Sequence, residues 1–201
     1  TQQVLPDKMR YNLEAIEKFS FFGDIKLMFM TVFAMLGALM FVSKLIMEWA
    51  PNIHFLGMLT MTYTLVYRRK ALIPIYVYVF VQGAYAGFNT WWVPYLYIWT
   101  ILWALTMLLP KKMPTWLCAV VYPALCGLHG FAFGILYAPA EALFYGFDFK
   151  TTLLWISKGF YFDMLHGFGN IAAGFLILPL SRLMIRLENK ANKNTQKPRT
   201  A

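Results

Sequence analysis

Charged side chains are scarce in this chain of 201 residues, and their scarcity excludes most kinds of soluble protein. They make up 13% of the sequence, whereas hydrophobic residues make up 60% and the mean hydropathy is +0.54. A soluble domain has roughly 25% charged and 45–50% apolar residues. So few polar side chains cannot cover a folded globule, and so many apolar ones exclude a disordered chain. The sequence therefore predicts an integral membrane protein.

Cysteine and histidine are also rare, with two and three residues. Cys118 and Cys126 lie in one apolar run, too far apart along a helix to form a disulfide easily. Their spacing does not match a metal site either, so we expect two small buried apolar side chains. The three scattered histidines, His54, His129 and His166, do not readily supply a metal centre. No metal or other cofactor is expected.

Motifs for catalysis and for nucleotide binding are missing from the sequence. It has no Gly-x-Ser-x-Gly elbow, no His-Glu-x-x-His pair and no glycine-rich phosphate loop. Asp163 with His129 or His166 would make two members of a hydrolytic triad, but no serine stands in a nucleophile motif. An enzyme is therefore disfavoured, and the energy for any transport has to come from another chain.

Six apolar segments follow an N-terminal stretch, residues 1–24, that is polar and mixed in charge. Met9, Leu13 and Ile16 recur there at helical spacing, so a helix on the membrane surface and a solvated tail both remain open. We expect crossings at about 25–49, 53–67, 71–87, 93–109, 114–137 and 161–183, with an amphipathic stretch at 138–158. The second segment is short, because a crossing takes about 20 residues. A polar tail, 188–201, is expected to be disordered.

Basic residues gather on alternate sides of the expected crossings. Most of the 18 lie before the first span, in the turns at 68–70 and 111–112, and after the last span. Cytoplasmic loops of membrane proteins carry such an excess of lysine and arginine. The pattern predicts an all-α bundle of six transmembrane helices, residues 25–187, with both termini in the cytoplasm. It also accounts for the net charge without a nucleic-acid partner.

The opposite side of the bundle is rich in aromatic residues, above all in the segment 87–97. This segment places Trp91, Trp92 and Tyr95 close to Asn89. Tryptophan and tyrosine favour the headgroup level of a membrane, and flat rings with polar tips also line ligand pockets. An interfacial belt and a ligand-binding wall are equally good interpretations.

Ionisable side chains within a span are costly, so each one needs an explanation. Lys44 and Glu48 lie four residues apart in the first span, and we expect them to pair along the helix. His129 in the fifth span is interpreted as hydrogen-bonded within the bundle, with a ligand contact as the alternative.

Asp163, His166 and Asn170 in the last span are spaced by three and four residues and therefore share one helix face. Glycines around them allow a helix or a ligand to come close. A carboxylate next to an imidazole fixes the tautomer of the ring. We interpret this face as a substrate contact in preference to a purely structural one.

Several segments carry a resemblance to a known family. The first span contains Ala34-Met35-Leu36-Gly37-Ala38, a match to an Ala-x-x-x-Ala motif, and the other matching segments are 49–54, 68–72, 87–97 and 162–170. Over about residues 25–187 the chain resembles the substrate-specific (S) components of energy-coupling factor transporters, the vitamin importers of bacteria.

The resemblance implies a multi-pass protein of the bacterial plasma membrane that captures a vitamin or vitamin precursor on the extracellular side. It implies delivery through a transmembrane scaffold (T) subunit driven by two ATPase subunits, with docking through Ala34, Gly37 and Ala38. Small side chains let a partner helix come close in lipid. The expected substrate-binding residues are Asn52, His54, Asn89, Trp91, Trp92, Tyr95, His129, Asp163, His166 and Asn170.

Two other functions remain open at this point. A small integral membrane enzyme would use Asp163 and His166 as acid and base. A non-catalytic assembly subunit would bind a protein partner and no small molecule.

Overall fold

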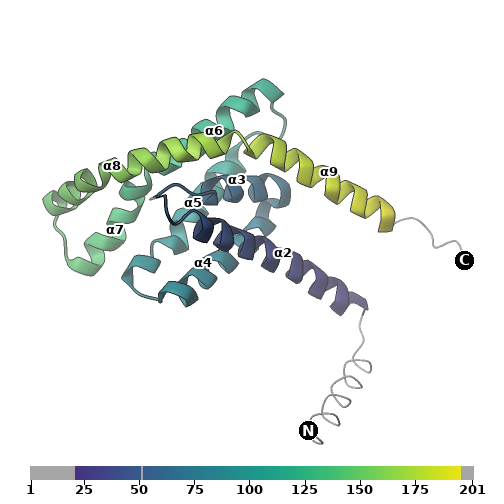
Figure 1. Ribbon diagram of the computed structural model, residues 1–201, viewed down its shortest axis with the longest axis horizontal. Coiled ribbons are helices and arrows are strands. Elements are labelled where there is room, and N and C mark those ends of the chain that lie inside the picture. The colour runs from purple at the N-terminus through teal and green to yellow at the C-terminus, as the bar shows by residue number, and fades with distance from the viewer. Residues whose placement is uncertain (1–20, 51, 196–201) are drawn as a thin grey trace, which may run out of the picture.

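The computed structural model describes residues 21–50 and 52–195, and every regular element in these ranges is a helix (Figure 1). The surface helix considered around Met9, Leu13 and Ile16 lies outside the described residues. The elements are α2 (Phe21–Ile46), α3 (Leu56–Tyr67), η1 (Arg68–Ala71), α4 (Leu72–Ala86), η2 (Thr90–Trp92), α5 (Tyr95–Leu108), α6 (Thr115–Phe131), α7 (Phe133–Tyr145), α8 (Phe149–Gly174) and α9 (Ile177–Thr195). The fold is therefore all-α, as expected.

Some of these helices have the length and composition of membrane spans. Thr90–Leu108 and Thr115–Tyr145 are each long and apolar enough to cross a bilayer, and Phe149–Gly174 with Ile177–Ala191, bent by 46°, adds a third if the pair is one span. The helices therefore indicate a membrane protein with two or three spans of full length in its described part.

Helix α3 lies at the centre of the molecule. Every residue from Leu56 to Thr64 is buried, and the helix contacts α5, α9, α6 and α8. Two of its threonines bond within the helix: Thr64 Oγ1 donates to the Thr60 carbonyl at 2.6 Å, and Thr62 Oγ1 donates to Met58 Sδ at 3.7 Å. A helix that is apolar on all sides belongs in the interior of a bundle. The shortness of this segment, noted in the sequence, fits a helix enclosed by its neighbours.

Two helix pairs flank α3. Helix α2 packs against α4, and α6 packs against α8. The second pair comes very close: a Cβ added at Gly174 of α8 would lie 2.6 Å from Pro123 Cα of α6, and one added at Gly130 of α6 would lie 2.8 Å from the His166 carbonyl oxygen. The expectation that small residues around His166 allow close approach is confirmed, and the approaching element is α6.

The C-terminal third differs from the expected boundaries. The stretch 138–158, expected to be one amphipathic segment, is divided between α7 and α8, and the last long helix begins at Phe149 rather than near residue 161. Gly146 ends α7 in the left-handed conformation (φ 66°). Asp148 then caps α8, since its Oδ1 accepts from Thr151 N at 2.7 Å. These two local signals place the break ahead of the apolar run.

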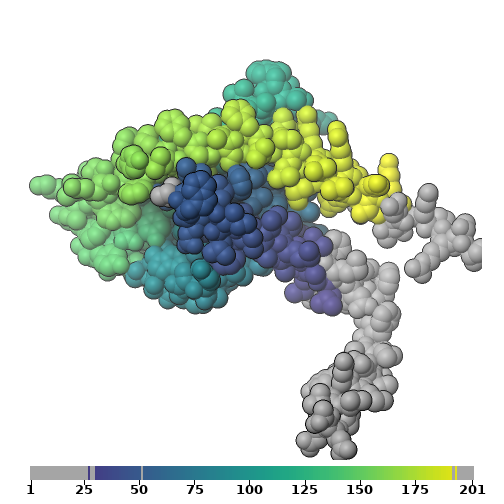
Figure 2. All heavy atoms as spheres, viewed as in Figure 1, coloured from purple at the N-terminus to yellow at the C-terminus, as the bar shows by residue number. Residues whose placement is uncertain are grey.

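The expectation of a disordered tail at 188–201 is wrong for its first part, which belongs to α9. It continues to Thr195, so residues 188–195 are helical, and 196–201 lie outside the described residues. Its last turns extend away from the other helices (Figures 1 and 2).

Candidate functional site

Five aromatic rings meet where α5, α6, α7 and α8 approach the turn before α3. We call them the ring cluster: His54, Trp99, His129, Phe133 and His166. The centroid distances are 4.8 Å for His54–His166, 4.6 Å for Phe133–His166, 6.3 Å for His129–Phe133, 5.8 Å for Trp99–His129 and 6.1 Å for His54–Trp99. All lie in the range of interacting aromatic pairs. The rings thus form a closed circuit that brings together all three histidines of the chain.

Four polar atoms of the ring cluster are buried and have no hydrogen-bond partner: His54 Nδ1, Trp99 Nε1, His129 Nδ1 and His166 Nε2. His129 Nε2 lies 3.1 Å from the Ile98 carbonyl oxygen. A carbonyl can only accept, so this nitrogen carries the hydrogen and Nδ1 is left as an acceptor. Buried polar atoms normally have partners. Their concentration here marks a place suited to the polar groups of a small molecule.

The expected polar face of α8 exists, and it points inward. Asp163, His166 and Asn170 are all buried, with 7%, 2% and 0% of their surfaces exposed. Asn170 Nδ2 donates to the Cys126 carbonyl at 3.3 Å, and its Oδ1 has no partner. The face is therefore turned toward α6 and α7 rather than toward lipid.

The expected pairing of Asp163 with His166 is wrong. Asp163 Oδ1 instead accepts from Gly134 N at 2.9 Å, which ties α8 to the start of α7. His166 directs its ring against His54 and Phe133. Through this oxygen the carboxylate of Asp163 holds α8 against α7.

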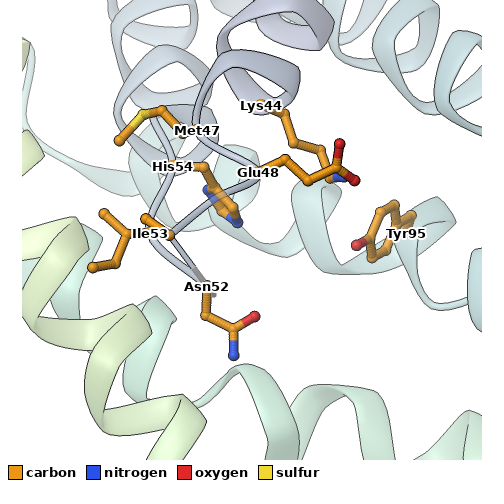
Figure 3. A pocket seen from close by; sticks show the side chains of 8 residues that line it. Lys44, Met47, Glu48, Asn52, Ile53, His54 and Tyr95 are labelled. Carbon is orange, nitrogen blue, oxygen red and sulfur yellow. The ribbon is translucent and has the colours of Figure 1, made fainter.

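A cavity of about 230 Å³ adjoins the ring cluster, between the end of α2, the turn after it and Tyr95 (Figure 3). His54 lines this cavity and also belongs to the ring cluster, so it connects the two. Tyr95 forms the opposite wall and packs against Trp99 and Phe133 at 6.0 and 6.4 Å. The complete lining is Lys44, Met47, Glu48, Ala50, Asn52, Ile53, His54 and Tyr95.

Charges of both signs stand at this cavity. Figure 3 shows the side chains of Lys44 and Glu48 extending together toward Tyr95. The expectation of a pair along one helix is corrected, because α2 ends at Ile46 and Glu48 lies in the following turn. Asn52 adopts a left-handed conformation (φ 57°), which asparagine tolerates better than most residues.

His54 lies in the turn between α2 and α3, and its ring is neutral at physiological pH. Removal from water, together with the nearby charge of Lys44, lowers the pKa of His54 to about 4. A neutral imidazole offers one donor and one acceptor nitrogen. The cavity therefore presents a hydrogen-bonding ring at its base and charged groups beside it.

Residues 89–92, which contain the two neighbouring tryptophans, lie outside this cavity. Trp92 Nε1 donates to the Val79 carbonyl at 2.8 Å, and Asn89 Oδ1 accepts from Trp91 N at 3.2 Å to start η2. Tyr137 donates from its hydroxyl to the Trp91 carbonyl. Asn89, Trp91 and Trp92 do not line the cavity. Only Trp91 comes near it, packing on Tyr95 at 5.6 Å.

The surface of α2 carries two of the three expected docking residues. Ala34 and Ala38 are exposed on one side of the helix, next to the exposed Met35. The third residue, Gly37, is not on this exposed side as expected. It is buried against α4, where an added Cβ would lie 2.8 Å from the Pro74 carbonyl oxygen. Positions four apart share a helix face, whereas Gly37 lies on the neighbouring side.

Sequence reasoning missed Trp99 and Phe133, which complete the ring cluster. Both stand in apolar runs, and no motif or spacing distinguishes them there. Cys118 and Cys126 are buried, as expected. In the described ranges, no group of three or more histidine, cysteine or acidic side chains is arranged to hold a metal ion.

No family model, no curated protein and no solved structure matches this chain.

Proposed function

We propose that the chain is the substrate-binding membrane subunit of an energy-coupling factor type importer in a bacterial plasma membrane. One observation carries the proposal: His54, which has an unpaired buried nitrogen and belongs to the ring cluster, lines a cavity of about 230 Å³. The resemblance in sequence supplies the transport role.

The cavity supports a vitamin or vitamin precursor as the ligand. Small-molecule sites combine ring-lined walls with a few polar groups that fix orientation. Here Tyr95 offers a ring face, His54 offers a hydrogen bond, and Lys44 can meet an anionic group of the ligand. Capture takes place at the outer side of the membrane, because the basic turns lie at the other end of the bundle.

Six crossings with both termini in the cytoplasm are part of the proposal. Arg68 Nη2 donates to the Met107 carbonyl at 3.1 Å, which sets the turn at 68–70 beside the end of α5. Arg182 Nη2 donates to Thr115 Oγ1 at 2.7 Å, which sets α9 beside the turn at 111–112. The basic segments thus share one end, as the positive-inside bias requires. In this arrangement α3, about 18 Å long by its residue count, is enclosed by its neighbours, whereas α4, about 23 Å long, leaves Ile73, Phe80 and Tyr85 exposed on one side.

Transfer of the ligand requires partners. A helix of the transmembrane scaffold subunit packs on the exposed side of α2 around Ala34 and Ala38, where small side chains permit close contact. Two separate ATPase subunits supply the energy, consistent with the lack of a phosphate-binding loop in this sequence.

The test is a binding assay on the purified chain in detergent with a panel of vitamins and their precursors. We expect one compound to bind tightly, and His54→Ala and Tyr95→Ala to weaken its binding at least about tenfold, which corresponds to ~1.4 kcal/mol. Lys150→Gln, an exposed change at the start of α8, serves as the matched control. Binding of no compound would favour an assembly subunit, and turnover by the chain alone would favour an enzyme.

A further inference from the structure

Helix α9 separates apolar from basic residues more strongly than the other described helices. Its basic side chains recur every three or four positions and so form one stripe: Arg182, Arg186, Lys190 and Lys193. Leu180, Leu183 and Leu187 recur in the same way along another side. Glu188 is the one acidic residue in the helix sequence.

Only the first turns of α9 are packed against the bundle. Ile177 and Ser181 are buried, whereas Leu183 and Leu187 have 50% and 58% of their surfaces exposed. Beyond Met184, every α9 side chain that the structure describes is exposed. Helix α9 therefore continues past the end of its contact with the bundle (Figure 2), and Leu187 lies on this exposed part.

The basic stripe is extended by its surroundings. Arg182 is held by Thr115, which follows the turn containing Lys111 and Lys112. Both lysines are exposed. The chain also bends by 46° between α8 and α9, so α9 does not continue in the direction of α8.

We propose that α9 lies in the interface of the inner leaflet and binds anionic phospholipid headgroups through Arg186, Lys190 and Lys193. A helix with one apolar and one basic side lies at this depth, with its leucines toward the acyl chains. The inner leaflet carries the negative surface potential that complements the stripe, and each lysine or arginine near it adds attraction. An acidic protein surface would complement the charges but leave Leu183 and Leu187 without an apolar environment.

The test uses the full chain reconstituted into vesicles of phosphatidylcholine, with and without phosphatidylglycerol. A polarity-sensitive fluorophore is attached to Leu187→Cys; the two native cysteines are buried and do not compete. Quenching by lipids with spin-labelled acyl chains reports the depth of the probe. We expect quenching to be about threefold stronger in vesicles with phosphatidylglycerol and to weaken as salt screens the attraction.

Two variants decide the source of the effect. Quenching in the triple variant should no longer depend on phosphatidylglycerol; this variant combines Arg186→Gln, Lys190→Gln and Lys193→Gln. In Lys150→Gln the quenching should depend on phosphatidylglycerol as it does in the wild type. Equal quenching in both kinds of vesicle would overturn recognition of anionic lipid. If the probe remains in water in both kinds of vesicle, α9 does not lie in the membrane interface. The basic stripe would then be a binding surface for an acidic protein.

A second measurement does not depend on the probe. The wild-type chain and the triple glutamine variant are purified in detergent from the same membranes, and the retained phospholipids are quantified by mass spectrometry. We expect about threefold less anionic lipid on the variant, with unchanged zwitterionic lipid. An equal ratio on both proteins contradicts the proposal. Melting temperatures that agree show that the comparison is between folded proteins.

Discussion

Gly134 and Asp163 hold α7 against α8 by a contact that leaves no room for a side chain. Gly134 N donates to the carboxylate, and a Cβ at this position would collide with the same carboxylate. We expect Gly134→Ala to destabilise the protein by about 1–3 kcal/mol, the usual cost of forcing atoms into a packed site. Thermal unfolding in detergent measures the change.

Gly159 offers the matched control, because nothing lies within 4 Å of a Cβ added there. It stands inside α8, where alanine is a better helix former than glycine by about 1 kcal/mol. Gly159→Ala should therefore leave the melting temperature unchanged or raise it. Equal destabilisation by both substitutions would mean that the contact at Gly134 is not the cause.

His54 gives the stability a specific dependence on pH. Its pKa of about 4 in the folded protein lies below the value of about 6.5 in an unfolded chain. Between these values the unfolded chain binds a proton that the folded one does not, so stability falls as pH is lowered. His54→Gln should show a shallower fall from pH 7 to pH 5 in thermal unfolding, although Lys44, His129 and His166 remain in place. Parallel profiles for the two proteins would show that His54 titrates normally.

The sequence predicted part of the candidate site at the level of single side chains. Helical spacing placed Asp163, His166 and Asn170 on one face, because the period of a helix is fixed. It did not predict which partner each would take. Asp163 bonds a backbone N–H, and a backbone group has no signature in a sequence. Trp99 and Phe133 were missed because apolar runs do not tell which rings face one another.

Helix α2 has two sides with different roles, and substitutions can separate them. Gly37 faces α4, whereas Ala38 is exposed. Gly37→Leu should lower the melting temperature, since the added atoms would displace α4. Ala38→Leu should leave the melting temperature and ligand affinity unchanged but reduce co-purification of the scaffold and ATPase subunits at least about tenfold, since a large side chain blocks close helix contact. Loss of stability in Ala38→Leu would place this side inside the bundle.

The boundaries of the helices could be predicted where the apolar sequence is interrupted at the same residues at which a helix ends. The turns at 68–70 and 111–114 separate helices as expected, because charged residues and proline interrupt apolar runs there. The break at 146–148 was placed wrongly, since the apolar residues 143–145 and 147 surround it. Gly146 and the Asp148 cap decide that break, and both are signals of single residues within a longer pattern.

The distribution of charge over the bundle predicts its orientation in a membrane. The turn at 68–70, the turn at 111–112 and α9 supply the basic end, tied together by the hydrogen bonds of Arg68 and Arg182. The end with the cavity carries Glu48 and Asp148 beside Lys44 and Lys150 and has no such excess. Because lysine and arginine are retained on the cytoplasmic side, the cavity should face outward.

Cysteine labelling of whole cells checks this orientation. Lys150 and Lys112 are both exposed, and they belong to opposite ends of the bundle. A membrane-impermeant maleimide should modify Lys150→Cys in intact cells, and Lys112→Cys only after the membrane is opened. The buried Cys118 and Cys126 give little background. Modification of Lys112→Cys in intact cells would show that the cavity faces the cytoplasm. A cavity on that side could not capture an extracellular ligand, so the proposed import function would be wrong even if the chain binds a vitamin.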